Sequence, residues 1–406
     1  MKRLSVLLVS IMACIVSIPA QAELIVSASD GHQPPEPGQA PHRVPDTVTA
    51  LDFTNATLKV LGSVAAPTSA LGPPQSVYVA PNGKWALVTA GSKGDPADMT
   101  KTVPDDTISV IDLSTPAQPR IVQTLHAGAA VSSVTVNRAG TLALASNTND
   151  DSVSIFTIAG NKLTPAGQLQ LEKGIRPWCI TFLRDGQGAL LQTMSASGLL
   201  RLKVDGTTVT NTGPIGGGVR GTMVVTTADG KYAIVNGSAP PPSAPDAAAA
   251  PMPAAAGAAG GRGAAGPRGP AMISMVDLAT GAVVATAPFG AGPEGVALSP
   301  DGNYLVTGIT NGSHAAPGAP GANDFGLLRV YKVGAGSLTQ LAESRTGRWC
   351  QGELVSKDNR TILVQCAVER EIEVFRFDGN SNLTQDVAAT AKFDAAPASM
   401  TRAANP

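Results

Sequence analysis

Short segments in which apolar and polar residues alternate recur along most of the chain. Alternation with a period of two predicts β-strands with one buried face. Each segment falls in a unit of about 45 residues with room for four strands, a repeat typical of a β-propeller. If strands a to d are counted outward from the channel, the alternating segments are the c strands: residues 47–53, 107–113, 152–156, 199–204, 272–278, 327–333 and 371–377.

A tight turn precedes most of these segments and separates strand a from strand b. Its residues are Asn82-Gly83, Ala139-Gly140, Asp185-Gly186, Asp229-Gly230, Asp301-Gly302 and Asp358-Asn359. Gly and Asn adopt positive φ angles at low cost, as hairpin turns require. We therefore assign these residues a structural role.

The two ends of the chain each carry part of one repeat. Residues 396–402 resemble strand a but have no further strands after them, while residues 24–26, 47–53 and 58–64 supply strands b, c and d. Pairing of these ends would close the ring and leave no open sheet edge. The sequence thus predicts an all-β, seven-bladed β-propeller over residues 23–406, closed by a composite blade from N- and C-terminal strands.

The first residues have the pattern of a secretory signal. Lys2 and Arg3 precede an apolar run over residues 4–17, and Ala20-Gln21-Ala22 forms a small-residue cleavage site. We expect residues 1–22 to be a signal peptide and the mature protein to be periplasmic or secreted. A lipoprotein anchored through Cys14, after Ile11-Met12-Ala13, is the alternative. No later segment is long and apolar enough to predict a transmembrane helix.

Three cysteines follow the signal region. Cys350 and Cys366 lie on the two arms of a hairpin that turns at residues 357–360, and an oxidising compartment favours a disulfide between them. Cys179 is then left over as a small buried residue. No Cys-x-x-Cys-His motif occurs, so covalent haem is not expected, and the net charge of −1 gives no reason to expect nucleic-acid binding. We expect a monomer.

The long insertions are not scattered. Four of the seven b–c connections are long: residues 30–46, 91–106, 237–271 and 311–324. In a propeller these connections emerge on the same face as the d–a connections, so one face is decorated and the other plain. Function in scaffolded folds concentrates on such loops. The Ala-, Gly- and Pro-rich segment 237–271 is predicted to be disordered, either as a tolerated insertion or as a flap over the channel mouth.

Residues that open strand a are the first candidates for a site, because they face the channel mouth. Arginine donates paired hydrogen bonds to carboxylate or phosphate, and tryptophan supplies an apolar wall. The alternative is that these side chains bind carbonyl groups of the neighbouring blade. The matched positions are Gln75, Ser132, Trp178, Thr222, Glu294 and Gln351, with Arg176, Arg220, Arg348 and Trp349 just before them.

A metal site is the second candidate. The loop of the composite blade holds Asp30, His32, Glu36, His42 and Asp46, and the next blade's loop holds Asp95, Asp98, Asp105 and Asp106. Oxygen and imidazole ligands from neighbouring loops suit a divalent cation. The alternative is turn capping, because Asp recurs at the ends of these loops. His126 and His314 are expected to be surface histidines.

Two phrases carry a family resemblance: Pro293-Glu294-Gly295-Val296-Ala297-Leu298-Ser299-Pro300-Asp301-Gly302 and Asp105-Asp106-Thr107-Ile108-Ser109-Val110-Ile111-Asp112-Leu113. They resemble the YVTN-type repeat family, which includes lactonase-like and surface-layer propellers. The resemblance implies a propeller fold and, for lactonase members, hydrolysis at the channel mouth. Gln75 stands where those members carry a His, and their Arg-His pair does not occur here.

Three functions therefore remain open. The first is an extracytoplasmic module that binds a small anionic molecule or a protein or peptide partner on the decorated face. The second is a lactonase-like hydrolase with its site at the channel mouth. The third is an oxidoreductase with a bound cofactor. No nucleophile elbow, phosphate loop or paired-carboxylate motif decides between them.

Overall fold

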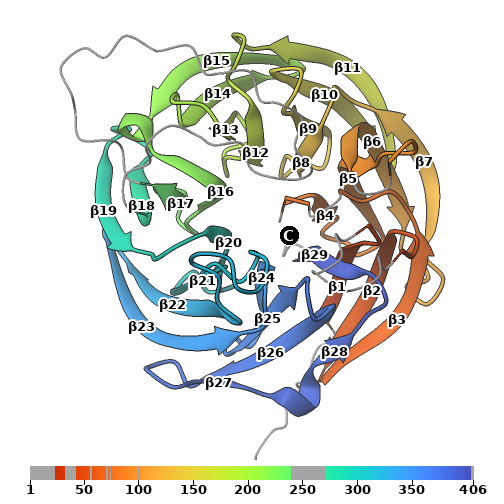
Figure 1. The fold of residues 1–406 in the computed structure, drawn as a ribbon. Coiled ribbons are helices and arrows are strands. Elements are labelled where there is room, and N and C mark those ends of the chain that lie inside the picture. Colours follow the sequence, from red (N-terminus) through yellow and green to blue (C-terminus); the bar gives the residue numbers. More distant parts are fainter. Residues whose placement is uncertain are drawn as a thin grey trace, which may run out of the picture.

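Seven antiparallel sheets form a ring around a central axis (Figure 1). This computed structural model describes residues 23–32, 43–54, 57–69, 72–73, 75–98, 101–238 and 271–403. The predicted signal peptide, Cys14, Glu36, His42 and nearly all of the segment 237–271 lie outside these residues. Within the described part, no helix has the length and hydropathy that crossing a membrane requires.

Each blade is a meander of four strands, with its first strand nearest the axis, except that the composite blade begins with the last strand of the chain. Blade 1 contains β4 (Val77–Val79), β5 (Trp85–Gly94), β6 (Thr102–Asp112) and β7 (Arg120–His126). Blade 2 contains β8 (Val131–Val136), β9 (Leu142–Asn147), β10 (Ser152–Ala159) and β11 (Lys162–Gln170). Blade 3 contains β12 (Pro177–Phe182), β13 (Gly188–Thr193), β14 (Leu199–Asp205) and β15 (Thr208–Ile215). Blade 4 contains β16 (Arg220–Thr226), β17 (Tyr232–Ser238), β18 (Ala271–Asp277) and β19 (Val283–Pro288). Blade 5 contains β20 (Pro293–Leu298), β21 (Tyr304–Ile309), β22 (Gly326–Gly334) and β23 (Ser337–Thr346). Blade 6 contains β24 (Cys350–Val355), β25 (Thr361–Cys366), β26 (Glu371–Phe377) and β27 (Leu383–Gln385), with β28 (Ala391–Lys392) also paired to β26. The composite blade contains β29 (Ala396–Arg402), β1 (Glu23–Asp30), β2 (Thr47–Thr54) and β3 (Thr57–Ala65), and two 3₁₀ turns are η1 (Gly216–Gly218) and η2 (Val387–Ala389).

The two chain ends are zipped together as predicted. Strand β29 pairs antiparallel with β1, with Ile25 opposite Arg402 and Ala28 opposite Ser399. In Figure 1 the blue β29 lies beside the red β1. The ring therefore closes through backbone hydrogen bonds, and the predicted seven-bladed propeller with a composite blade is confirmed.

Neighbouring blades bury their apolar faces against each other. One cluster joins blades 1 and 2 through Leu87, Val110 and Phe156, and a similar cluster joins the composite blade to blade 1. The residues that alternate along each strand supply these contacts. The a–b turns behave as the sequence predicts, with φ between +58° and +73° at Gly83, Gly140, Gly186, Gly230, Gly302 and Asn359.

One predicted loop is largely a β-ladder. Residues 91–106 were expected to form a b–c loop, but β5 runs to Gly94 and β6 begins at Thr102, so only residues 95–101 connect them. The extra ladder pairs Ser92 with Pro104 and Lys93 with Val103. Both of its faces are partly or fully exposed, so apolar alternation does not reveal it. Together with the loop 310–325 and the described residues 31–32 and 43–46, this arm lies at the end of the ring that we call the loop-decorated face.

Candidate functional site

A β-bulge interrupts the start of the innermost strand in six blades. The register shifts between Val131 and Ser133, between Pro177 and Cys179, and between Gly221 and Met223, with equivalent shifts in blades 5 and 6 and in the composite blade. The bulged residues of blades 2, 3 and 4 are Ser132, Trp178 and Thr222. A bulge re-aims the side chain it carries. The positions matched in the sequence are therefore equivalent in the structure.

Two of these side chains bridge blades. The Ser132 hydroxyl donates to the Trp178 carbonyl at 2.6 Å, and the Thr222 hydroxyl donates to the Glu294 carbonyl at 2.7 Å. The same Glu294 carbonyl accepts from Asn236. For Ser132 and Thr222 the structural alternative therefore holds, because their hydroxyl groups bind carbonyls of the next blade.

Gln75 reaches two other blades across the ring. Its Nε2 donates to the Val224 carbonyl at 3.2 Å, and its Oε1 accepts from the Cys179 thiol. Cys179 is fully buried, and burial raises its pKa to about 12. The thiol is therefore protonated and unreactive at neutral pH, as expected for a structural cysteine. Gln75 ties blade 1 to blades 3 and 4.

Three other predicted site residues carry hydrogen-bond donors that have no acceptor among the described residues. The Trp178 Nε1, the Arg220 Nε and the Gln351 Nε2 are buried and have no hydrogen-bond partner among the described residues. They come from blades 3, 4 and 6, and each lies within the first two residues of its innermost strand. Buried donors without acceptors are costly and rare in native proteins. Trp178 and Gln351 hold equivalent bulge positions, and Arg220 lies two residues before the bulge of blade 4. Together these donors mark this end of the ring as a place for a ligand rich in acceptors.

The rest of the rim is held by local contacts. The Trp349 N–H donates to the Ser313 hydroxyl at 2.9 Å, and its ring lies 6.0 Å from that of His314, so the loop 310–325 reaches blade 6. The Arg348 N–H donates to the Glu369 carboxylate at 2.8 Å. Burial raises the pKa of Glu369. Arg348 thus lies beside an acid.

Arg176 occupies the same rim on blade 3. Its N–H donates to the Asp151 carboxylate at 2.6 Å, and its backbone has a φ of +51°. Trp349 has a φ of +49° at the equivalent place in blade 6. Residues other than glycine adopt this conformation only where surrounding contacts enforce it.

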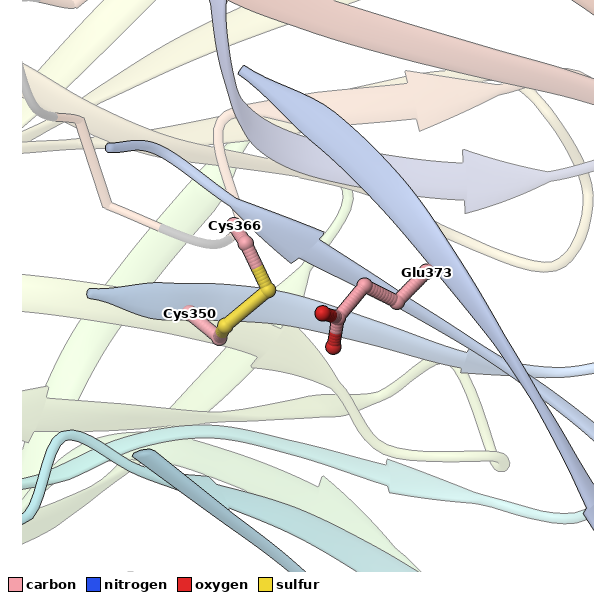
Figure 2. A group of neighbouring side chains, drawn as sticks. All are labelled: Cys350, Cys366 and Glu373. Carbon is pink, nitrogen blue, oxygen red and sulfur yellow. A yellow bond between two sulfur atoms is a disulfide. The ribbon is translucent and has the colours of Figure 1, made fainter. Parts of the chain in front are cut away.

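The predicted disulfide lies directly beneath this rim. Cys350 and Cys366 face each other across β24 and β25, and their sulfur atoms are bonded. Figure 2 shows the Glu373 carboxylate of β26 turned toward the disulfide. Glu373 accepts a hydrogen bond from the Gly347 N–H at 3.1 Å, and burial raises its pKa to about 7. Because each sulfur is bonded to the other, these residues do not form a thiolate metal site in this state.

A cavity of about 260 Å³ lies on the axis of the ring. All seven innermost strands line it, mostly with apolar residues such as Val134, Ile180 and Leu354. Its hydrogen-bonding or charged residues are Gln75, Glu353, Arg402, Thr135, Thr181 and Thr401. The cavity is therefore lined by polar and apolar groups together, and Trp178, Arg220 and Gln351 are not among its lining residues.

Glu353 is a residue that the sequence analysis missed. It is only 6% exposed, and neither carboxylate oxygen has a hydrogen-bond partner of good geometry among the described residues. Burial raises its pKa to about 8, and the negative charge of Glu294 adds to the shift. A sequence signal was available, because the matched strand positions in the other blades hold Val77, Val134, Ile180, Val224, Val296 and Met400.

The metal candidates are only partly brought together. The His32 Nδ1 lies 2.9 Å from the Asp46 carboxylate, and the His32 N–H donates to Asp30 at 2.7 Å. Asp46 also accepts from the Gly31 and Thr68 N–H groups. The nearby carboxylates raise the pKa of His32, led by Asp30, although burial opposes the shift. These contacts make a hydrogen-bonded cluster on the decorated face, and metal binding there stays a prediction.

The other acidic candidates make contacts within their own hairpin. Asp95 accepts from the Ala97 N–H at 2.8 Å, and Asp98 pairs with Lys101 at 2.8 Å. Among the described residues, the acidic groups close enough to share an ion with His32 are Asp30 and Asp46. The hairpin still meets the composite blade, because the His32 ring lies against Gly94. Asp105 accepts hydrogen bonds from the Asp106 N–H and the Thr107 hydroxyl, and the His126 ring lies 2.8 Å from the Asp106 carboxylate.

No family model matches the chain, and no curated protein sequence matches it. Solved structures do. The periplasmic gluconolactonase of Pseudomonas aeruginosa aligns with a TM-score of 0.60 at 14% identity, over 95% of this chain and 100% of that one. Candidate 6-phosphogluconolactonases from Bacteroides uniformis and Bacteroides fragilis align with TM-scores of 0.66 and 0.65, both at 15% identity and over 94% of this chain, covering 99% and 98% of those chains. These likenesses show the propeller fold, while membership of the YVTN-type repeat family stays a prediction.

Proposed function

We propose that the protein is an extracytoplasmic hydrolase that opens lactones of sugar acids at the loop-decorated end of its channel. The observation that carries the proposal is the set of unpartnered buried donors at Trp178, Arg220 and Gln351. A sugar lactone presents a carbonyl, a ring oxygen and several hydroxyl oxygens, which are the acceptors such donors lack. The guanidinium of Arg220 would also hold the carboxylate of the product.

Three further observations support this function over simple adhesion to a protein partner. The axial cavity is lined by all seven innermost strands, and Gln75 and Glu353 place polar groups in it among apolar residues. Glu353, whose pKa burial raises to about 8, is among its lining residues, and carboxyl groups with raised pKa values gather at functional sites. The fold is shared with a periplasmic gluconolactonase and with candidate 6-phosphogluconolactonases.

An extracytoplasmic location fits the same account. The buried Cys350–Cys366 disulfide is of a kind that forms and persists in oxidising compartments. It joins the strand that carries Gln351 to its neighbour, so it also fixes one of the three donors. The predicted signal peptide would deliver the chain to such a compartment.

Binding can be tested separately from turnover. Thermal unfolding of the purified mature protein should shift upward with D-gluconate or D-glucono-1,5-lactone, because a ligand of the folded state stabilises it. Trp178→Phe keeps an aromatic ring but removes the Nε1 donor, and we expect it to weaken binding about fivefold, the value of one neutral hydrogen bond. Trp85→Phe, in the core between blades 1 and 2, is the matched control for affinity. Equal affinity in the wild type and Trp178→Phe would remove the donor set from the site.

A further inference from the structure

Glu353 lies where the other blades place an apolar side chain. It is the third residue from the end of β24, and the same position holds Val134, Ile180, Val224 and Val296 in blades 2 to 5. A carboxyl group at such a position loses its hydration and gains no apolar contact in return. The substitution is costly for stability, which points to a role outside packing.

The neighbouring blade leaves space for this side chain. A β-carbon at Gly295 would overlap the Oε2 of Glu353, and a β-carbon at Gly308 would overlap its Oε1. Both glycines belong to blade 5, on β20 and β21. Two missing side chains therefore create the pocket that receives the carboxyl group, and neither oxygen gains a well-formed hydrogen bond in it from the described residues.

The charged surroundings of Glu353 are simple. On β20 the neighbour that acts on it is Glu294, which raises its pKa in addition to the effect of burial. On β29 the guanidinium of Arg402 is bound by the Glu23 carboxylate and the Val355 carbonyl. The remaining titratable group on the packed strands is the Tyr304 hydroxyl of β21, which donates to the Gly379 carbonyl. Cys350 on β24 is bonded to Cys366 and carries no thiol proton.

We propose that Glu353 is the proton donor for ring opening, an inference that rests on the lactone hydrolysis proposed above. It combines three features: a residue among those that line the axial cavity, a buried carboxylate for which the described residues supply no side-chain donor, and a space beside the cavity left by two glycines. Glu294 is a positioning residue that keeps Glu353 protonated by its negative charge.

The reaction balances with water as the only co-reactant. Water adds to the lactone carbonyl carbon, the bond between that carbon and the ring oxygen breaks, and the ring oxygen takes the proton of Glu353. The proton released by the attacking water returns to Glu353. The hydroxy acid product then loses its carboxyl proton to solvent. A proton donor must be protonated at the working pH and near the leaving oxygen, and Glu353 meets the first condition below about pH 8.

The test is the pH profile of kcat for D-glucono-1,5-lactone, with the spontaneous reaction subtracted. Wild-type activity should fall as the pH rises through about 8. Glu353→Gln should lower kcat by about 10²- to 10⁴-fold, the usual contribution of general acid–base catalysis, and abolish this fall. Glu294→Gln should keep activity but move the fall to lower pH, because it removes a like charge. Glu343→Gln, at an exposed ion pair with Arg329, is the control and should match the wild type.

The outcomes separate the two proposals. If the wild type hydrolyses the lactone while Glu353→Gln keeps its kcat, the role of Glu353 is overturned and the proposed function stands. The same holds if Glu294→Gln leaves the pH profile unmoved, since a merely structural role would not couple its charge to the profile. If the wild type does not accelerate hydrolysis, the proposed function fails, and this inference fails with it.

Discussion

The Glu23 carboxylate lies 3.4 Å from the Arg402 guanidinium and joins the two ends of the chain. Both side chains are largely buried, and Arg402 also donates to the Val355 carbonyl. Glu23 accepts two further hydrogen bonds from the turn of blade 6, through the Ser356 hydroxyl at 2.8 Å and the Lys357 N–H at 3.1 Å. The closure of the ring therefore rests on a buried charge network as well as on strand pairing.

Breaking this pair should destabilise the protein. Arg402→Met leaves the Glu23 carboxylate buried without its counter-charge, which typically costs about 3–5 kcal/mol. Chemical denaturation in urea would measure the loss of unfolding free energy. Adding Glu23→Gln to Arg402→Met should recover part of it, because the unpaired charge is then gone.

A matched control is Lys231→Met, at the exposed pair of Lys231 with Asp229. Exposed pairs contribute about 1 kcal/mol or less. If Arg402→Met is no less stable than Lys231→Met, the charge network does not support closure.

The disulfide should stabilise the blade that carries Gln351. It spans 16 residues of sequence, and closing a loop of that size in the unfolded chain is worth about 3 kcal/mol. Reduction of the wild type under denaturing conditions, or the double substitution Cys350→Ala with Cys366→Ala, should lower the unfolding free energy by about that amount. Reductant should not change the stability of the double variant. A response of the double variant equal to that of the wild type would assign the effect to something other than this bond.

Stability should fall as the pH rises toward neutrality. Burial holds the pKa of Glu373 at about 7, above its ordinary value of 4.5, so the folded state binds its proton more tightly than the unfolded state. The contribution is complete below about pH 4.5 and is lost as the pH rises through 7. Glu353, with a pKa raised to about 8, acts with the same sign.

Glu373→Gln removes one of the two carboxyl groups whose ionisation makes the unfolding free energy depend on pH. Relative to the wild type, the variant should gain stability between pH 5 and pH 8, on the order of 2–3 kcal/mol. Urea midpoints at four pH values would measure this difference, with Glu343→Gln as the exposed control. A pH dependence equal to that of the wild type would show that Glu373 ionises normally.

Arg220 should govern the affinity for an anionic ligand. Hydrogen bonds to charged groups contribute about 1.5–3 kcal/mol, so Arg220→Met should weaken gluconate binding by about 10- to 100-fold. Arg120→Met is a suitable control, because Arg120 is exposed and pairs with Asp112 on outer strands. Isothermal titration of both variants would decide the matter. Unchanged affinity in Arg220→Met would exclude this guanidinium from the site.

The fold could be predicted from the sequence because each repeat carries its own strand and turn signals. Alternation marked the c strands, and Gly or Asn at the a–b turns marked the hairpins. The unmatched segment 396–402 then required a partner at the other end of the chain, which β1 supplies. The extension of β5 and β6 could not be foreseen, since its pairing uses backbone groups and its side chains carry no pattern.

The site was harder to predict because residues at the same bulge position in different blades have different hydrogen-bond partners. Ser132, Trp178 and Thr222 share the bulge position, yet the hydroxyl groups bind the next blade while the indole N–H finds no acceptor in the part of the chain that the structure describes. Which outcome applies depends on distances between blades, and these are absent from a single sequence. Glu353 could have been found by aligning the repeats, because it interrupts a column of apolar residues.

The central claim is that the donors at the loop-decorated end hold a sugar lactone for hydrolysis. The most direct measurement is the rate of acid release from D-glucono-1,5-lactone in a pH-stat, with and without purified mature protein. We predict a rate well above the spontaneous one, proportional to protein concentration and sharply reduced in Trp178→Phe combined with Arg220→Met. A rate equal to that of buffer alone would contradict the account.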